Sequence, residues 1–344
     1  MDESSGDGTV VSKRRGAQLG SAAWSLLAHP LVRFVGLLVF ALTAVACAEE
    51  AAPRGARHER RSEASKAKPY TSGLPGAPSD PGAEHDSGTG GTTPPETSAG
   101  KTDETMEFGG KTRSYILVVP EGYDASKSYP LVLSFHGNPS SATFQASHLP
   151  FESVSKEAAV VVYPQASTSD WDLYTATDGN ADMSWIRALP EEIATKKASI
   201  DRKRVFGFGY SGGGFFLSQF ACRFGDVFKA ISINAGGGPD EDEMGYGTLA
   251  NGCYQCPGGP VATIVTHGSL DVVVTPSSGE RAKSCFAAYN GCKSSVSASA
   301  PSPCEEYDDC ATGKPVKWCR IPGQSHLPWN KAMTTAWDFF SALP

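Results

Sequence analysis

Six short apolar runs, separated by more polar stretches, organise the chain from Glu107 onward. Most are continuously apolar, as strands are when both faces of a parallel sheet are covered. They predict strands over Ser114–Val119, Leu131–Phe135, Val160–Tyr163, Val205–Phe208, Ala230–Ile233 and Val261–Thr266. Helices are predicted over Asp182–Ala198 and Gly213–Phe224, and a last one near Asn330, its predicted N-cap. This alternation predicts an α/β fold with a mostly parallel central sheet, helices on both faces, and ligands beyond the carboxyl ends of the strands.

The chain before this pattern has little that could build a core. Residues 48–105 are rich in Pro, Ser, Gly, Ala, Thr and charged residues, so they cannot offset their ordering entropy by burial. We predict a disordered linker there. Residues 106–344, about 240 residues, then form one domain, which is long enough to bury roughly 70–75% of its unfolded surface.

An export signal is predicted over residues 1–47. The apolar run Phe34–Ala46 follows a basic stretch and has about 13 residues, whereas a membrane-spanning helix needs about 20. It ends at Cys47 in a pattern that resembles a bacterial lipobox, which would lipidate Cys47 and tether the domain to a membrane. Simple cleavage near Ala46 or Ala48, or an uncleaved anchor, are the alternatives. We expect an extracellular or cell-surface protein.

Charge and cysteine content narrow the class further. The formal net charge of -7, from 30 Lys plus Arg and 37 Asp plus Glu, gives no reason to expect a nucleic-acid partner. Eight cysteines remain beyond Cys47, which predicts up to four disulfides of unknown connectivity in an oxidising compartment. Cys310 and Cys319 flank a short turn-like segment and are the favoured pair. Cys253 and Cys256 could form a redox or zinc pair, but no second ligand pair lies at finger spacing, which favours disulfides.

The segment Gly209-Tyr210-Ser211-Gly212-Gly213 is the sharpest chemical motif. It follows a predicted strand directly and opens a predicted helix, which is the context of a nucleophile elbow. In that turn Ser211 is lifted out of the sheet, and the N–H of Gly212 points at a forming oxyanion. The alternative is a glycine-rich turn that cradles a phosphate. A dinucleotide fingerprint does not fit, because its glycine spacing and its downstream acid are missing.

A nucleophilic serine needs a base and an orienting acid further along the chain. His326 lies in a loop before the last helix, whereas His267, the other downstream histidine, ends a predicted strand. We therefore predict His326 as the general base. Asp271 follows the same strand and is the predicted acid, because a carboxylate there can orient the imidazole. The rival acids Asp240–Glu243 lie in a polar loop.

The oxyanion and substrate contacts are predicted from neighbouring residues. Gly212 and Asn138 are the predicted oxyanion donors through their backbone N–H groups, with Gly137 next. His136 is interpreted as structural. Tyr210 is placed near the pocket because it flanks the nucleophile. Two tryptophans, Trp329 and Trp171, are candidates for stacking on a phenolic acyl group or a sugar, with core or rim packing as the alternative.

Residues 107–344 resemble the polyhydroxybutyrate depolymerase and feruloyl esterase group of secreted esterases. The resemblance depends on the order of these pieces: Leu131–Gly137 (LVLSFHG), Val161–Gln165 (VVYPQ), Asp201–Gly213 (DRKRVFGFGYSGG), Ala221-Cys222 before Phe228-Lys229-Ala230, His267–Asp271 (HGSLD), and a late His beside Pro and Trp. It implies an α/β-hydrolase fold, a triad of Ser211, Asp271 and His326, and neither metal nor organic cofactor. It also implies disulfides between Cys222 and Cys256 and between Cys310 and Cys319.

Two departures affect the predicted substrate. Asn138 stands where the group has cysteine, and Pro328-Trp329 reverses the usual Trp-Pro order. The pocket near the base is therefore altered, which leaves polymer and aromatic esters both open.

The function predicted from these features is that of an exported, monomeric serine carboxylic-ester hydrolase with an acyl-enzyme intermediate. Its expected substrates are hydroxyalkanoate oligomers, or feruloyl or acetyl esters of plant polysaccharide. The alternatives are a non-catalytic cell-surface polysaccharide-binding protein, an acyltransferase on the same fold, and a peptidase. A pure binding protein has no need for a nucleophile, an acid and a base together, and no additional peptidase domain is evident.

Overall fold

A computed structural model describes residues 98–175, 179–239 and 247–344. The predicted export signal with Cys47, most of the predicted linker, and the rival acids Asp240–Glu243 lie outside these ranges. None of the helices in the described ranges combines the length and the apolar character that a membrane span requires.

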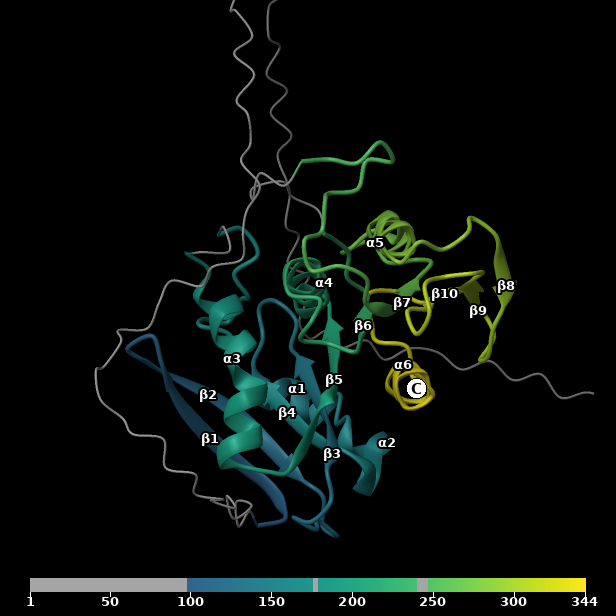
Figure 1. The fold of residues 1–344 in the computed structure, drawn as a ribbon. Helices are drawn as coiled ribbons and strands as arrows, with labels where there is room; N and C mark the ends of the chain where they lie inside the picture. Colours follow the sequence, from purple (N-terminus) through teal and green to yellow (C-terminus); the bar gives the residue numbers. More distant parts are fainter. Residues whose placement is uncertain (1–97, 176–178, 240–246) are drawn as a thin grey trace, which may run out of the picture. The chain divides into compact units, whose positions relative to one another are not determined.

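The strands of the described ranges form one ten-stranded sheet (Figure 1). Its order is β1-β2-β4-β3-β5-β6-β7-β10-β9-β8. Five neighbouring pairs are parallel, from β4 through β3, β5, β6 and β7 to β10, and antiparallel strands flank them at both edges. The strands are β1 (Gly100–Phe108), β2 (Lys111–Val119), β3 (Tyr129–Phe135), β4 (Val160–Pro164), β5 (Ile200–Tyr210), β6 (Ala230–Asn234), β7 (Ala262–Gly268), β8 (Val296–Ala298), β9 (Cys304–Tyr307) and β10 (Val316–Ile321).

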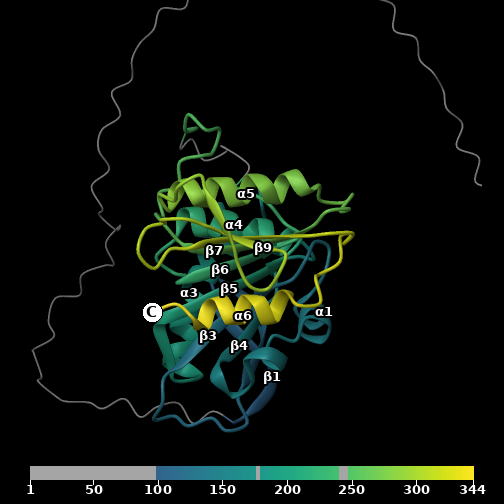
Figure 2. The same ribbon diagram turned by 90° about the vertical axis from the view of Figure 1, so that its right-hand side faces the viewer.

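Helices cover both faces of the sheet (Figures 1 and 2). On one face α3 (Ala181–Lys196), α4 (Gly212–Arg223) and α5 (Pro276–Tyr289) bury their apolar residues in one core cluster. On the other face α1 (Ala142–His148) and α6 (Ala332–Ser341) share a second cluster. The short helix α2 (Glu152–Ser155) and the 3₁₀ turn η1 (Lys156–Ala158) lead into β4. The predicted α/β fold is confirmed.

Element bounds differ from the prediction where polar residues enter regular structure. β5 begins at Ile200, five residues before the predicted strand. The prediction missed its first half because the segment DRKR there is polar. β1 begins at Gly100, within the end of the segment predicted as linker. The predicted cap Asn330 is corrected: α6 starts at Ala332, its N-cap is Lys331, and no side chain caps it.

Four disulfides join the eight cysteines of the domain. The bonds are Cys222–Cys256, Cys253–Cys285, Cys292–Cys310 and Cys304–Cys319. The first was predicted and is confirmed, but the predicted pair of Cys310 with Cys319 is wrong. Antiparallel pairing places Cys304 directly opposite Cys319. Cys310 instead lies beside Cys292, where backbone hydrogen bonds join residues 290–293 to residues 308–311.

Candidate active site

Ser211 occupies the tight turn between β5 and α4. Its φ of 52° lies in the left-handed region, which a non-glycine residue adopts at a cost, so the surrounding structure must hold it there. The turn closes because Gly209 and Gly213 face each other without side chains. A Cβ on Gly209 would lie 2.5 Å from the carbonyl oxygen of Gly213. The segment predicted as a nucleophile elbow thus forms a tight strand-to-helix turn with Ser211 at its apex.

Gly213→Ala is expected to destabilise the fold and to abolish activity. The new Cβ would lie 2.5 Å from the carbonyl oxygen of Phe135, a backbone atom that cannot move without displacing β3. Overpacking of this kind costs about 1–3 kcal/mol, and occasionally more. The free energy of unfolding in urea measures it. Gly214→Ala is the matched control, because its nearest contacts are at 3.4 Å. Equal stability of the two variants would contradict the close packing of Gly213.

Ser211, His326 and Asp271 come together at the carboxyl ends of parallel strands. Ser211 follows β5, Asp271 follows β7, and His326 lies in the loop between β10 and α6. His326 Nε2 lies 3.0 Å from Ser211 Oγ, and His326 Nδ1 lies 2.8 Å from Asp271 Oδ2. Because a carboxylate only accepts hydrogen bonds, Nδ1 carries the proton and Nε2 is left to accept the serine proton.

The carboxylate of Asp271 is buried and held from two sides. Its Oδ1 accepts hydrogen bonds of 3.0 Å from the backbone N–H groups of Val273 and Val274. On the other oxygen, His267 Nε2 lies 3.3 Å from Oδ2 and also 2.8 Å from the carbonyl oxygen of Val274. Both neighbours are acceptors, so this Nε2 carries a proton. His267 was predicted only as a strand-end residue; its spacing of four from Asp271 is the sequence signal for this contact.

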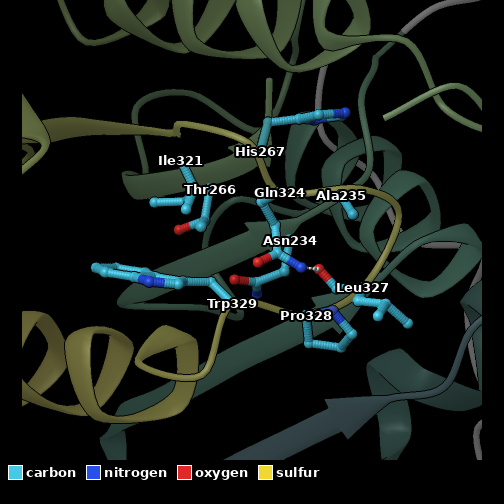
Figure 3. Close-up of a pocket in the computed structure, with 10 residues that line it drawn as sticks. Asn234, Ala235, Thr266, His267, Ile321, Gln324, Leu327, Pro328 and Trp329 are labelled. Carbon is cyan, nitrogen blue, oxygen red and sulfur yellow. Dashed lines mark hydrogen bonds between the residues drawn. The ribbon is translucent and has the colours of Figure 1, made fainter. Parts of the chain in front are cut away.

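The loop that carries His326 is fixed by hydrogen bonds on both sides of the histidine. Gln324 Nε2 donates to the carbonyl oxygen of Leu327 across it, and Tyr210 donates its hydroxyl hydrogen to the carbonyl oxygen of His326. Burial, and secondarily the Asp271 carboxylate, raise the pKa of Tyr210, so its hydroxyl stays protonated as a donor. Beneath the loop is a hollow of about 10 Å³, room for about one water molecule, lined by Asn234 and Gln324 among others (Figure 3).

The two predicted oxyanion donors are neighbours. A Cβ on Gly212 would lie 2.6 Å from Asn138 Oδ1, so the absence of a side chain at Gly212 allows this approach. Gly212 is the first residue of α4, so its N–H has no acceptor within the helix. Within the described ranges the backbone N–H of Asn138 likewise donates to no protein acceptor. Two backbone donors therefore lie beside Ser211.

Two hollows share Phe144 and Tyr210 as walls, and one of them reaches the nucleophile. The first, of about 420 Å³, contains Ser211, His326 and the loop from Gly137 to Ser141. The second, of about 430 Å³, is mostly apolar and is lined by Leu149, Leu327, Pro328, Trp329 and Met333 among others. Tyr210 and Trp329 thus line hollows that a ligand can enter.

Trp171 does not line either hollow. Its side chain is buried, stacks on Phe216 at 4.5 Å between ring centroids, and donates from Nε1 to the carbonyl oxygen of His136. Its backbone N–H donates to Asn138 Oδ1. This placement favours the packing alternative and makes Trp171 a support for the oxyanion loop.

His136 is buried and neutral. Its Nδ1 lies 2.8 Å from the carbonyl oxygen of Gly137, and its Nε2 accepts from the backbone N–H of Ala166 at 3.2 Å. Protonation of Nε2 would break the second bond. Burial lowers the pKa of His136, which agrees with the predicted structural role.

This pKa shift predicts an acid-dependent loss of stability. Unfolded histidine binds a proton below about pH 6.5, while folded His136 does so only at lower pH. The contribution of His136 to stability is therefore complete above about pH 6.5 and is lost as pH falls through the lowered pKa. The free energy of unfolding of His136→Gln should fall less between pH 7.5 and pH 5 than that of the wild type. Parallel pH curves would contradict this.

The described residues contain no group of three or more His, Cys, Asp or Glu side chains arranged to hold a metal ion.

No protein-family model matches the chain. A probable feruloyl esterase C of Aspergillus terreus is 29% identical over 247 residues, which cover 67% of this chain and 84% of that protein. Feruloyl esterase C of Emericella nidulans is 27% identical over 248 residues, with the same shares covered. Over about two thirds of its length the chain is therefore similar to feruloyl esterases.

A solved structure agrees with this assignment at the level of the fold. The acetyl xylan esterase of Aspergillus awamori superposes with a TM-score of 0.58 at 16% identity, over 71% of this chain and 99% of that protein. The similarity in sequence supports a feruloyl esterase-like carboxylic ester hydrolase. The predicted likeness to feruloyl esterases is thereby confirmed.

Proposed function

We propose that this feruloyl esterase-like protein is an exported serine esterase that cleaves feruloyl or acetyl esters of plant polysaccharide through Ser211, His326 and Asp271. The observation that carries the proposal is the position of the His326 ring, 3.0 Å from a hydroxyl on one side and 2.8 Å from a buried carboxylate on the other. This arrangement lets an imidazole take a proton from the hydroxyl while the carboxylate stabilises the imidazolium.

The reaction proceeds in two halves. Ser211 Oγ attacks the ester carbonyl carbon as His326 Nε2 takes its proton, and the oxyanion accepts from the N–H groups of Gly212 and Asn138. His326 then returns the proton to the leaving alcohol, which leaves an acyl-enzyme. Water, deprotonated by His326, attacks the acyl carbon, and the acid departs as Ser211 regains its proton.

A substrate panel with a covalent probe tests this proposal. We expect hydrolysis of methyl ferulate and 4-nitrophenyl acetate, and none of 4-nitroacetanilide, which would report peptidase-type amide cleavage. Hydroxyalkanoate oligomers, the other predicted substrates, belong in the same panel. Diethyl 4-nitrophenyl phosphate should place a diethylphosphoryl group on Ser211, seen by peptide mass spectrometry. An adduct only elsewhere, or turnover that survives complete labelling, would overturn the assignment.

Export is supported by the four disulfides, which persist in oxidising compartments. We propose that Cys47 is lipidated and that the linker segment after it serves as a tether. Mass spectrometry of the mature N-terminus decides this: a diacylglyceryl group on Cys47 supports it, and an unmodified N-terminus near Ala46 or Ala48 contradicts it.

A further inference from the structure

Large apolar side chains are exposed around the active site. We call Phe144, Leu270, Val272, Val273 and Leu327 the apolar rim. The exposed fractions are 87% for Val272, 70% for Val273 and 64% for Leu327. Eight large hydrophobic residues are exposed in the described ranges, and these are five of them. Single exposed apolar residues are ordinary, but a group of them on one face marks a binding surface.

The apolar rim lies at one edge of the sheet. Leu270, Val272 and Val273 flank Asp271 in the loop after β7, and Leu327 follows His326 in the loop after β10. β7 and β10 are adjacent and parallel, so both loops leave the sheet at the same edge. The backbone N–H of Leu270 donates to the carbonyl oxygen of Gln324, which ties the two loops together. Phe144 lines the hollow that contains Ser211. The rim is thus continuous with the catalytic pocket.

The hold on Asp271 does not require these apolar side chains. The carboxylate is bound by backbone N–H groups, which any residue except proline supplies. Val272 makes none of these bonds, and at 87% exposure its side chain packs little against the domain. An apolar residue there gains burial only when another surface covers it.

The composition of the two loops identifies the chemistry of that surface. From Gly268 to Ser278 the only charged side chain is Asp271, which is buried, and from Gly323 to Trp329 the only titratable one is His326. An anionic membrane would be recognised by Lys and Arg, which these loops lack. A sugar surface would be met by aromatic rings, whereas four of the five rim residues are aliphatic. Uncharged aliphatic side chains fit an uncharged aliphatic partner.

We propose that the apolar rim adsorbs the enzyme to water-insoluble aliphatic esters presented as droplets, so that such esters are a further substrate class. The hydrolysis of these esters rests on the proposed function of Ser211; the adsorption does not. On a droplet the rim would face the ester phase and bring the hollow at Ser211 against it.

Adsorption is tested without turnover in the Ser211→Ala background. The full-length protein is mixed with tributyrin droplets, and the bound fraction is measured after the droplets are separated by flotation. Leu270→Ser with Val272→Ser should lower the partition coefficient by about tenfold or more, since two aliphatic side chains lose their burial. Leu249→Ser with Val296→Ser, which removes two exposed aliphatic residues outside the rim, should leave it unchanged. Equal adsorption of the rim variant and its parent, or an equal loss in the control, would overturn the proposal.

Turnover separates this proposal from the proposed function. With Ser211 intact, the rate of the parent should rise as tributyrin passes its solubility limit, and that of the rim variant should not. Both should hydrolyse dissolved 4-nitrophenyl acetate within about twofold of each other, with unchanged thermal unfolding. If the parent fails on the dissolved ester, the proposed function fails, while the adsorption result still decides the role of the rim. A rim variant that keeps the droplet-dependent rise would overturn the rim assignment.

Discussion

Ser211→Ala is expected to lower kcat for methyl ferulate and 4-nitrophenyl acetate by about 10⁴–10⁶-fold, with little change in KM. The loss is large because acylation needs a nucleophile at the apex of the turn, and alanine leaves His326 with no proton to take. Binding is kept because the hydroxyl is a small part of the hollow. Steady-state kinetics on both esters measure the split between kcat and KM.

Ser218→Ala is the matched control for this result. Ser218 is buried in the same helix, α4, and within the described ranges its hydroxyl has no hydrogen-bond partner. Removing it should therefore leave both turnover and thermal unfolding close to wild type. If Ser211→Ala kept turnover within tenfold of wild type while Ser218→Ala behaved as expected, hydrolysis would be taking place elsewhere in the protein.

The central sheet was predictable because its strands are buried on both faces. β3, β4, β6 and β7 are mostly apolar and buried along their whole length, and the prediction found all of them to within a few residues. The elements that escaped prediction carry no such pattern. β1 is mostly polar, and none of its residues is fully buried. α5 buries a face made mostly of small residues, which hydropathy does not distinguish from a loop.

Disulfide pairing and strand order at the C-terminal edge of the sheet could not be predicted either, because the strands there also lack an apolar pattern. Cys304 and Cys319 meet because β9 and β10 pair in one register, and β9 has only four residues, three of them polar. Proximity along the chain favoured Cys310 for Cys319, but the register of a short edge strand decides the bond.

The candidate triad was predictable because each member has a local signature. Ser211 is the centre of a Gly-x-Ser-x-Gly segment at the end of a strand, Asp271 follows the next-but-one strand, and His326 lies in a loop further along the chain. The groups that hold the triad in place have no such local signature in the sequence. Backbone N–H groups from Val273 and Val274 are set by loop conformation, and Trp171 supports the oxyanion loop from a segment about 33 residues away.

Asp271→Asn is expected to lower kcat by about 10⁴-fold at neutral pH, through the tautomer of His326. The N–H groups of Val273 and Val274 both point at Oδ1, so the amide oxygen of asparagine takes that position. Its NH₂ group then faces His326 Nδ1, which must give up its proton to accept. The proton moves to Nε2, and the imidazole can no longer take the hydrogen of Ser211.

Two measurements distinguish this tautomer effect from a loss of structure. The free energy of unfolding should fall only modestly, because the two backbone hydrogen bonds to the amide oxygen remain. The modest fall is expected because the new NH₂ group faces the proton on His267 Nε2, 3.3 Å away. The downfield proton resonance of His326 Nδ1–H, expected in the wild type, should be absent in Asp271→Asn. The 2.8 Å contact between His326 Nδ1 and Asp271 Oδ2 is the cause we assign to both the resonance and the turnover. A variant that retains the resonance and turns over within tenfold of wild type would therefore show that Asp271 does not set the protonation of His326.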